Sequence, residues 1–455
     1  MGDKSMLRLT RLAAVVALGM VVVLAAPAAR AAETETEEGF ERLFNGKDLT
    51  GWDGHKELWS VTEGGAIRGE TTPQKRAPGN TFLIWQGGKL KDFVLRLKFR
   101  VGNSNNSGVQ FRSVHLPAKP NASNRWVVKG YQMEVQEKPG KVGFLYDEKR
   151  RGWLVNVGDF MEINPVEGGK IKKEVVGKIS DVKQLIKDGY YKSNKDAEAW
   201  NEYEITCRGN HIVVKLNGYQ TIELIDNDKA QRTLEGVLAL QIHGGSPMWV
   251  EFKDIRVRKL TESYGEAFRL FNGKDLTGWT IPFDNCKETF SAKDGVLAIT
   301  GRPGGYIRTE AKYTNYVIRA QIRHIKGCNN GLLLRTTGKD KVWPRSIECQ
   351  GAKNNLGDIW NIDKFPMKAA ADRTRGRHTR KMHPSNEKPV GQWNQYEIYL
   401  NKGDLRMYVN GLLQNAATEC QEIPGTICLQ SEGGPVEWRN LVLIPIVEPK
   451  PKKAE

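Results

Sequence analysis

Three short segments alternate apolar residues with side chains that could do chemistry: residues 109–112, 131–136 and 237–243. Successive side chains of a β-strand point to opposite faces, so each segment, read as a strand, shows its polar groups on one side. Those groups are Gln110 and Arg112, then Gln132, Glu134 and Gln136, then Gln241 and His243. A carboxylate, amides, an imidazole and a guanidinium on one surface suit a polyhydroxylated ligand.

The same pattern returns in the second half of the chain, where otherwise diverged segments keep matching residue types. Its members are Arg335, Glu348, Gln350, Gln430 and Glu432. A solvated sheet face would also alternate polar and apolar residues. The reuse of Arg, Glu and Gln at matched places favours a ligand-binding face.

Two loops add candidates. Residues 144–153 bring together a tyrosine, an aspartate and two arginines that we expect beside the polar groove, namely Tyr146, Asp147, Arg150 and Arg151. In the second half, His378 and His383 stand five residues apart. That spacing leaves a divalent metal open without defining a metal site, and the sequence names no cofactor with certainty.

An internal repeat organises the elements that must position these residues. The decapeptide Leu-Phe-Asn-Gly-Lys-Asp-Leu-Thr-Gly-Trp at 43–52 recurs unchanged at 270–279, and later blocks recur in the same order. We therefore expect two domains, residues 39–260 and 266–447. Apolar residues within each recur with period two, and Asn-Gly pairs mark hairpins. This pattern predicts an all-β chain of two tandem sandwiches or jelly rolls.

Length and charge limit the class of protein. The chain has 455 residues and a formal net charge of +16, with 39% hydrophobic residues, which is enough for two packed cores. Its basic residues are scattered rather than interleaved with aromatic residues, so we do not expect a nucleic-acid partner.

The ends of the chain predict where the protein acts. Lys4, Arg8 and Arg11 precede an apolar run and the small-residue site Ala29-Arg-Ala31. This order is typical of a signal peptide, which we place at residues 1–32. We therefore expect a periplasmic or extracellular protein with no membrane span after cleavage, and a basic disordered tail at 448–455. Six cysteines permit disulfides, but their pairing and the oligomeric state cannot be read from the sequence.

Several motifs together resemble the 3-keto-disaccharide hydrolase family, also described as the 3-keto-glucoside 1,2-lyase and 3-keto-2-hydroxy-glucal hydratase domain. They are the decapeptide, Asn-Ser-Gly-Val-Gln-Phe-Arg, Tyr-Gln-Met-Glu-Val-Gln, Leu-Tyr-Asp-Glu-Lys-Arg-Arg-Gly, Trp-Asn-Glu-Tyr and Leu-Gln-Ile-His-Gly-Gly. The resemblance covers nearly all of both copies. It implies concanavalin A-like jelly rolls, an exported location, and a 3-keto-glycoside or another carbohydrate as ligand.

The resemblance also implies a reaction. A ketone at C3 acidifies the hydrogen on C2; a base removes it, the C1 substituent leaves, and water adds to the resulting enone. By type and face, His243 or Glu134 is the candidate base, Arg112 a donor to the enolate and Tyr146 a proton donor to the leaving group. Glu432 stands where the first copy has His243, which puts the activity of the second copy in doubt unless His383 substitutes. The alternative is a non-catalytic, lectin-like carbohydrate-binding protein, because fold does not imply function.

Overall fold

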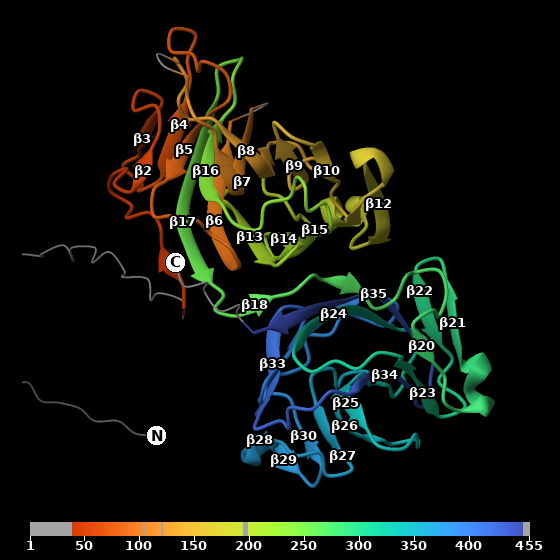
Figure 1. The fold of residues 1–455 in the computed structure, drawn as a ribbon. Coiled ribbons are helices and arrows are strands. Elements are labelled where there is room, and N and C mark those ends of the chain that lie inside the picture. Colours follow the sequence, from red (N-terminus) through yellow and green to blue (C-terminus); the bar gives the residue numbers. More distant parts are fainter. Residues whose placement is uncertain (1–38, 103–104, 120–121, 194–198, 449–455) are drawn as a thin grey trace, which may run out of the picture. The chain divides into compact units, whose positions relative to one another are not determined.

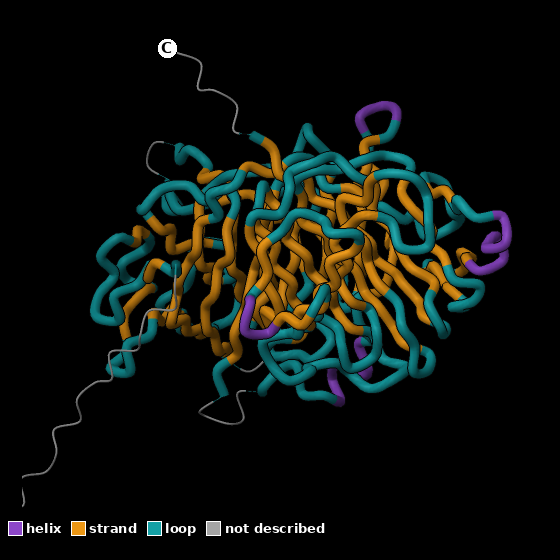
Figure 2. The backbone as a smooth tube through the Cα atoms, turned by 90° about the horizontal axis from the view of Figure 1, so that it is seen from below, coloured by secondary structure: helices purple, strands orange, loops and turns teal. Residues whose placement is uncertain are grey.

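The computed structural model describes residues 39–102, 105–119, 122–193 and 199–448. The expected leader at 1–32 lies outside the described residues, as does all but the first residue of the expected tail at 448–455. The regular secondary structure of the described residues is almost all strand, and these strands form two sheets in each half (Figures 1 and 2). The prediction of an all-β chain with two tandem jelly-roll sandwiches is confirmed.

The first sandwich pairs a broad sheet with a narrower one. In order across the sheet, the broad one runs β12 (Ile171–Lys178), β11 (Asp159–Pro165), β15 (Tyr219–Asp226), β14 (His211–Leu216), β13 (Asn201–Arg208), β6 (Phe93–Val101), β17 (Trp249–Lys259), β4 (Ile67–Glu70) and β3 (Trp59–Val61), with β1 (Glu41–Arg42) beside β17. The narrower one runs β10 (Gly152–Val155), β9 (Leu145–Glu148), β8 (Val128–Gln136), β7 (Asn106–His115), β16 (Val237–Ile242), β5 (Thr81–Trp85) and β2 (Trp52–Asp53).

The second sandwich repeats this plan. Its broad sheet runs β21 (Phe290–Lys293), β22 (Val296–Ile299), β35 (Val436–Val447), β24 (Tyr316–His324), β31 (Asn394–Asn401), β32 (Asp404–Val409), β33 (Leu412–Thr418) and β28 (Lys368–Ala369), with β18 (Ser263–Tyr264) and β19 (Phe268–Arg269) beside β35. The other sheet runs β20 (Trp279–Thr280), β23 (Gly305–Thr309), β34 (Thr426–Ser431), β25 (Gly331–Thr337), β26 (Arg345–Gln350), β27 (Ile359–Ile362), β30 (His378–Thr379) and β29 (Thr374–Arg375).

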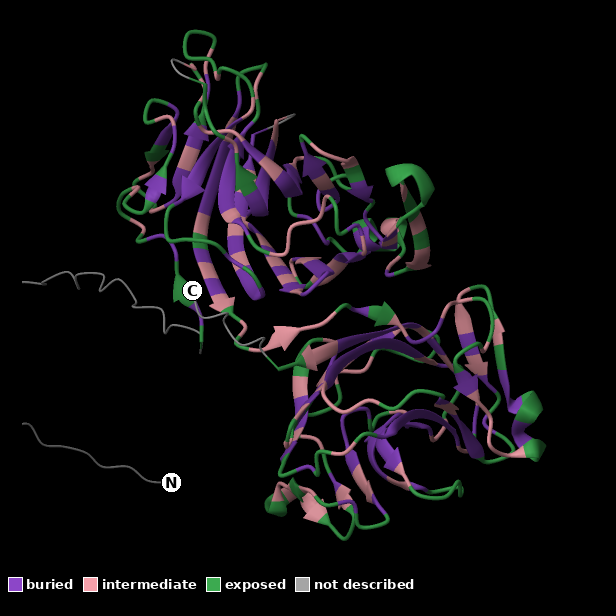
Figure 3. Ribbon diagram, viewed as in Figure 1, coloured by how far each residue is buried: buried purple, intermediate pink, exposed green. Residues whose placement is uncertain are grey.

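Period-two burial builds each core between its two sheets. In β6 the apolar members Phe93, Leu95, Leu97 and Phe99 are wholly buried, whereas Arg96 and Lys98, which alternate with them, are partly exposed. The facing sheet contributes fully buried side chains, including Val109, Phe111, Met133 and Val135. Buried segments accordingly run along the inner strands of both sandwiches (Figure 3).

The repeated decapeptide has a structural role in both copies. The indole nitrogen of Trp52 donates to the carbonyl of Leu43 at 2.8 Å, and that of Trp279 donates to the carbonyl of Leu270 at 2.7 Å. In the first copy, the turn between Leu43 and Trp52 is closed by a hydrogen bond from Asn45 Nδ2 to Asp48 Oδ1, 2.8 Å long. Because these bonds tie the start of each sandwich to a buried tryptophan, fold rather than ligand binding explains the unchanged sequence.

Helices are few among the described residues. α1 (Val182–Lys187) begins after Asp181, whose side chain accepts from the backbone of Gln184, an N-cap contact. Three short 3-10 turns cover Glu167–Gly169, Asp284–Thr289 and Ala371–Arg373. Within the described ranges no helix is long and apolar enough to cross a membrane. All six cysteines are described, and each is a free thiol.

Candidate functional site

A layer of polar side chains lies on the narrower sheet of the first sandwich, on the side away from the core. Strand register aligns Gln110 with Gln132 and Gln132 with Tyr146, so β7, β8 and β9 show these residues on one side. We call this layer the first polar face. Its members are Asn106, Gln110, Gln132, Glu134, Gln136, Tyr146, Glu148 and Gln241.

Glu134 is the central group of the first polar face. Its neighbours Met133 and Val135 point into the core and are wholly buried, as strand alternation predicts. The Glu134 carboxylate accepts from the side-chain amides of Asn106, Gln132 (3.2 Å) and Gln136 (3.1 Å). The pKa of Glu134 is raised to about 7, mainly by burial and in smaller part by the charge of Glu148, against the lowering effect of these amides.

A chain of amides fixes the orientation of this carboxyl group. Ser113 Oγ donates to Gln110 Oε1 at 2.7 Å, and Gln110 Nε2 donates to Gln132 Oε1 at 2.7 Å. Gln241 Nε2 donates to the same oxygen at 3.0 Å, so the Gln132 amide must turn its nitrogen toward Glu134. A carboxyl group positioned this firmly does not need to reorganise when a ligand arrives.

Two acceptor oxygens beside Glu134 are left open. Gln241 Oε1 and Asn106 Oδ1 are buried, and the described residues supply neither with a hydrogen-bond donor. Buried polar atoms are almost always paired in native proteins, so such exceptions need an explanation. The hydroxyl groups of a sugar would supply the missing donors.

Glycine at 108 makes room for these side chains. A Cβ atom there would lie 2.4 Å from the side-chain carbon Cδ of Gln132. Gly331 holds the matching place in the second sandwich, where a Cβ atom would lie 2.3 Å from Gln430 Oε1 and 2.7 Å from Glu348 Oε1. The glycine of each Asn-x-Gly motif therefore lets polar side chains cross the sheet face.

Glu148 is a second acid of the first polar face, and sequence reasoning missed it. It lies two residues after Tyr146 on β9, is 7% exposed, and approaches Asn80 Nδ2 at 3.4 Å. Alternation within Leu-Tyr-Asp-Glu would have shown that Tyr146 and Glu148 share a face that Asp147 does not.

His243 and Tyr146 lie toward the outside of the site. His243 follows the last residue of β16 and is exposed, with Nδ1 2.7 Å from the carbonyl oxygen of Gly244. Tyr146 is half-buried on the same side of the sheet as Gln132. Neither is joined to Glu134 by a hydrogen bond among the described residues.

Arg112 does not lie on the first polar face, which corrects the expectation from alternation. A β-bulge after Phe111 breaks the period, and Arg112 adopts a left-handed φ of 46°. Its guanidinium, 1% exposed, pairs with Asp92 at 3.0 Å and donates to the carbonyls of Lys91 and Gly209, both at 2.6 Å. All its donors point into the protein, so it links the two sheets.

Arg335 repeats this arrangement in the second sandwich. It has a φ of 48° beside a bulge, and donates to the carbonyls of Thr314 and Gln421. The matched arginines that favoured a binding face are matched because they are structural.

The cluster of Asp147, Arg150 and Arg151 also turns away from the first polar face. Asp147 pairs across the sheet with Tyr131, whose side chain is in the core, and it is wholly buried. It accepts from Arg150 at 2.8 Å and from Arg151 at 2.6 Å. Arg151 also reaches Asp226 at 2.8 Å, so these charges neutralise one another inside the sandwich.

A second polar face occupies the corresponding sheet of the second sandwich. Register across the strands aligns Tyr306 with Gln430, Leu333 with Glu348, Glu348 with Trp360, and Trp360 with His378. Burial raises the pKa of Glu348 to about 8, with a further increase from Glu432 and an opposing effect of Arg377. As in the first sandwich, a buried glutamine oxygen, Gln430 Oε1, finds no donor among the described residues.

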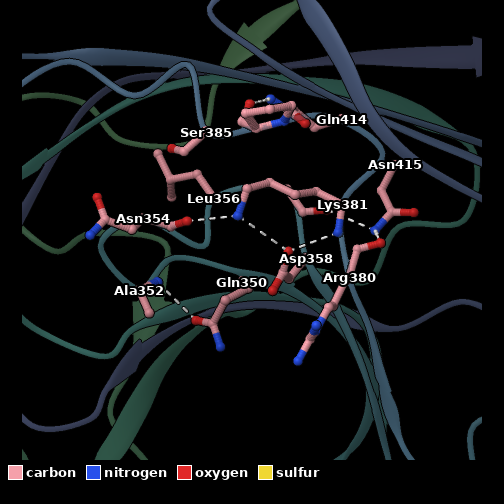
Figure 4. Close-up of polar contacts among 12 residues, drawn as sticks. Gln350, Ala352, Asn354, Leu356, Asp358, Arg380, Lys381, Ser385, Gln414 and Asn415 are labelled. Carbon is pink, nitrogen blue, oxygen red and sulfur yellow. Dashed lines mark hydrogen bonds and ion pairs between the residues drawn. The ribbon is translucent and has the colours of Figure 1, made fainter. Parts of the chain in front are cut away.

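The remaining candidates of the second sandwich differ in placement. Gln350 Oε1 accepts from the backbone nitrogens of Gly351 and Ala352, both at 2.8 Å, so it closes a turn (Figure 4). Glu432 is half-buried near Glu348. His383 is exposed, and its backbone nitrogen lies 3.4 Å from Gln414 Oε1. Sequence reasoning did not single out Trp360, and it considered His378 only for a metal site, whereas the two rings stack on this face.

Two further features concern ligands. Among the described residues, no group of three or more His, Cys, Asp or Glu side chains could hold a metal ion. A surface hollow beside the first decapeptide is lined by residues 47–54, Lys56, residues 59–61 and Leu83, none of which belongs to either polar face.

Comparison with known proteins follows the same two-copy division. The model of the 3-keto-alpha-glucoside-1,2-lyase-like domain matches residues 39–258 and again 266–444. A search of curated proteins found no match.

Solved structures similar to part of the chain act on or bind carbohydrates by their descriptions. A glycosyl hydrolase described as putative, from Parabacteroides distasonis, is 22% identical, with 40% of this chain and 94% of that chain covered and a TM-score of 0.31. The Bacillus licheniformis β-glucanase is 15% identical, with 40% and 99% covered and a TM-score of 0.31. A carbohydrate-binding module from Bacillus subtilis is 14% identical, with 37% and 96% covered and a TM-score of 0.25.

Proposed function

Because the chain belongs to the 3-keto-alpha-glucoside-1,2-lyase-like family, and is thus a carbohydrate-active protein, we propose that it is an exported enzyme that cleaves 3-keto-glycosides. Cleavage proceeds by removal of the C2 proton and loss of the C1 substituent, and water addition then completes a net hydrolysis. The observation that supports this most directly is the buried Glu134 carboxyl, held by three amides beside two open acceptor oxygens.

Glu134 is the base of the proposed elimination. Its carboxylate takes the proton from C2, and the C–H electron pair first forms the enolate with the C3 carbonyl. The enolate then collapses to a C1=C2 double bond, the C3 carbonyl re-forms, and the C1–O bond breaks with its electron pair on the leaving oxygen. A carboxyl whose pKa is raised to about 7 is a stronger base than an ordinary glutamate, and roughly half of it is ionised at neutral pH.

The other members of the first polar face bind and protonate. Gln241 Oε1 and Asn106 Oδ1 accept from sugar hydroxyls, since they have no donor among the described residues. Tyr146, on the strand beside Gln132, donates the proton that the leaving oxygen needs. Arg112 takes no part, because its donors are occupied.

The first test compares a 3-keto-glucoside with the same glucoside before oxidation. Only the ketone makes the C2 hydrogen acidic, so we expect aglycone release from the 3-keto-glucoside and none above background from the unoxidised sugar. Chromatography of the aglycone measures both. Cleavage of the two at comparable rates would contradict the mechanism, and binding of the 3-keto-glucoside without release would favour a lectin-like protein instead.

The second test is the pH dependence of kcat/KM. The Glu134 base must be ionised, so kcat/KM for aglycone release should rise through pH about 7 and level off above it. The effect on stability has the opposite sign. The folded-state pKa is raised, so this group's contribution to folding is lost as the pH rises toward about 7. A kcat/KM that falls over the same interval would assign the proton transfer to a group that works protonated.

A further inference from the structure

A single row of side chains runs across the second polar face from its acid to the edge of the sheet. Residues that pair directly across antiparallel strands point to the same side of a sheet. The register pairs Glu348 with Trp360, Trp360 with His378, and His378 with Arg375. These four side chains therefore lie on one side of β26, β27, β30 and β29. Because β29 is the last strand of the sheet, the row ends in a cation at the sheet edge.

The acid of the second polar face stands at a different place from the acid of the first. Gly108 pairs with Glu134, whereas the matching Gly331 pairs with Gln350. An amide thus takes the place of the proposed base, and its oxygen already accepts from two backbone nitrogens. Glu348 lies two residues earlier on the strand. The chemistry proposed for the first sandwich therefore does not transfer to the second.

The inner end of the row offers groups that suit sugar hydroxyls. Gln430 is 1% exposed, and its Oε1 has no donor among the described residues. A Cβ atom on Gly331 would lie 2.3 Å from this oxygen and 2.7 Å from Glu348 Oε1, so both oxygens lie over the glycine. The pKa of Glu348 is raised to about 8, mainly by burial. Its carboxyl group is mostly protonated at neutral pH, so it can donate to a hydroxyl group and does not repel an anion.

Two stacked rings form the middle of the row. The rings of Trp360 and His378 have centroids 4.4 Å apart and planes 8° apart. Rings that stack across neighbouring strands turn their edges, not their faces, toward a ligand over the sheet. The edge is the positive part of an aromatic ring's quadrupole, so this stack favours a negatively charged ligand.

A buried aspartate fixes the His378 ring. His378 Nε2 lies 2.8 Å from Asp358 Oδ2, and Asp358 is 3% exposed. The other carboxylate oxygen accepts from the backbone nitrogen of Lys381 at 2.9 Å, and the Lys381 ammonium lies 3.6 Å away (Figure 4). This ammonium balances the aspartate charge. The imidazole is thus oriented without adding a negative charge to the row.

Two arginines at the edge of the sheet are available to an anion. Arg375 and Arg377 are exposed, and neither forms an ion pair with a carboxylate among the described residues. The Arg377 guanidinium lies 5.2 Å from the centre of the Trp360 ring, a cation–π contact that holds it beside the row. A guanidinium presents a planar fork of donors that matches a carboxylate.

We propose that the second polar face binds an acidic oligosaccharide, with sugar hydroxyls on Glu348 and Gln430 and the carboxylate of a uronate, a sugar acid, on Arg375 and Arg377. Three strand spacings of about 4.8 Å separate the two ends of the row, so the site takes an oligosaccharide rather than a single sugar. A uronate carries its planar carboxylate on the sugar ring, which lets one ligand meet both the ring edges and the guanidinium forks. No bond of the ligand changes, so this binding site is separate from the proposed elimination.

Titration calorimetry of the full chain with tetragalacturonate, a chain of four uronates, tests this inference. We expect binding that weakens at least tenfold when the carboxylates are methyl-esterified, and that weakens as salt is added, since exposed charges are screened. Arg377→Gln should weaken tetragalacturonate binding about tenfold, because charge-assisted hydrogen bonds to the carboxylate are lost. Arg375→Gln should behave alike. Both side chains are exposed, so neither change should lower the melting temperature.

Arg406→Gln is the matched control. Arg406 is exposed on β32 in the other sheet of the same sandwich, and its guanidinium lies 4.8 Å from the centre of the Tyr399 ring. It resembles Arg377 in charge and in its aromatic contact but lies off the second polar face. Arg406→Gln should therefore bind tetragalacturonate with wild-type affinity. Equal weakening by Arg406→Gln and Arg377→Gln would mean attraction by the net charge alone, which overturns the inference.

Three further results would also overturn it. The first is equal affinity for tetragalacturonate and its methyl ester, which would leave the arginines without a role. The second is hexaglutamate binding as tightly as tetragalacturonate, which would make the face a site for acidic peptides. The third is tighter binding of a dextran sulfate oligosaccharide, which would assign the arginines to sulfate. Aglycone release by Arg377→Gln should stay at the wild-type rate, so a failure of this inference leaves the elimination untouched, and the reverse holds as well.

Discussion

Replacing Glu134 with glutamine is expected to lower the rate of aglycone release from a 3-keto-glycoside by at least a hundredfold. Loss of a general base costs about a hundredfold to ten-thousandfold, or roughly 3 to 5 kcal/mol in the activation barrier. Folding should change little, because glutamine keeps the shape and removes a carboxylate that burial disfavours. One surrounding amide must turn to face the new nitrogen, so we expect a stability change within about 1 kcal/mol.

The matched control for this variant is Glu235→Gln. Glu235 is exposed and lies just before β16 in the same sandwich, so the same chemical change there should leave both release and melting unaltered. Single-turnover release and thermal melting, run on both variants, measure the two effects. Wild-type release by Glu134→Gln, or a melting temperature lowered by many degrees, would remove Glu134 from the reaction.

Replacing Arg112 with alanine is expected to unfold the first sandwich at a much lower temperature. Asp92, 5% exposed, would keep its contact from the Gly209 nitrogen at 2.7 Å but lose its only ion-pair partner among the described residues. Two backbone carbonyls would lose donors as well. Breaking a buried pair costs about 3–5 kcal/mol, or roughly 10 °C for a domain of this size.

Thermal melting and turnover distinguish this role from ligand binding. Well below the melting temperature, Arg112→Ala should release aglycone at nearly the wild-type rate. Lys259→Ala removes an exposed ion pair with Glu41, 3.1 Å long, and should cost less than about 1 kcal/mol. An Arg112→Ala protein that melts normally but loses turnover would mean that the guanidinium takes part in the reaction, as the sequence pattern predicted.

The alternation of residues along a strand predicts the placement of some side chains of the first sandwich but not of others. Alternation within residues 131–136 placed Glu134 outside the core, and the structure agrees because β8 is regular at that point. The same rule failed at Arg112, where a bulge re-aims the chain. The residues around Arg112 do not predict that bulge, because the groups that bind the Arg112 side chain, Asp92 and Gly209, belong to other parts of the sandwich.

The sequence by itself determined the two-copy architecture, the strand period and the side of the strand on which Glu134 lies, because these follow from the repeat and from backbone geometry over a few residues. Only the tertiary structure decided which charged groups neutralise one another and which stay available. Asp147 and Asp226 share Arg151 as an ion-pair partner, and His378 lies beside its hydrogen-bond partner Asp358 only in the folded chain. The pairing of charges depends on contacts between strands that lie far apart in the chain, so the alternation of residues along one strand does not predict it.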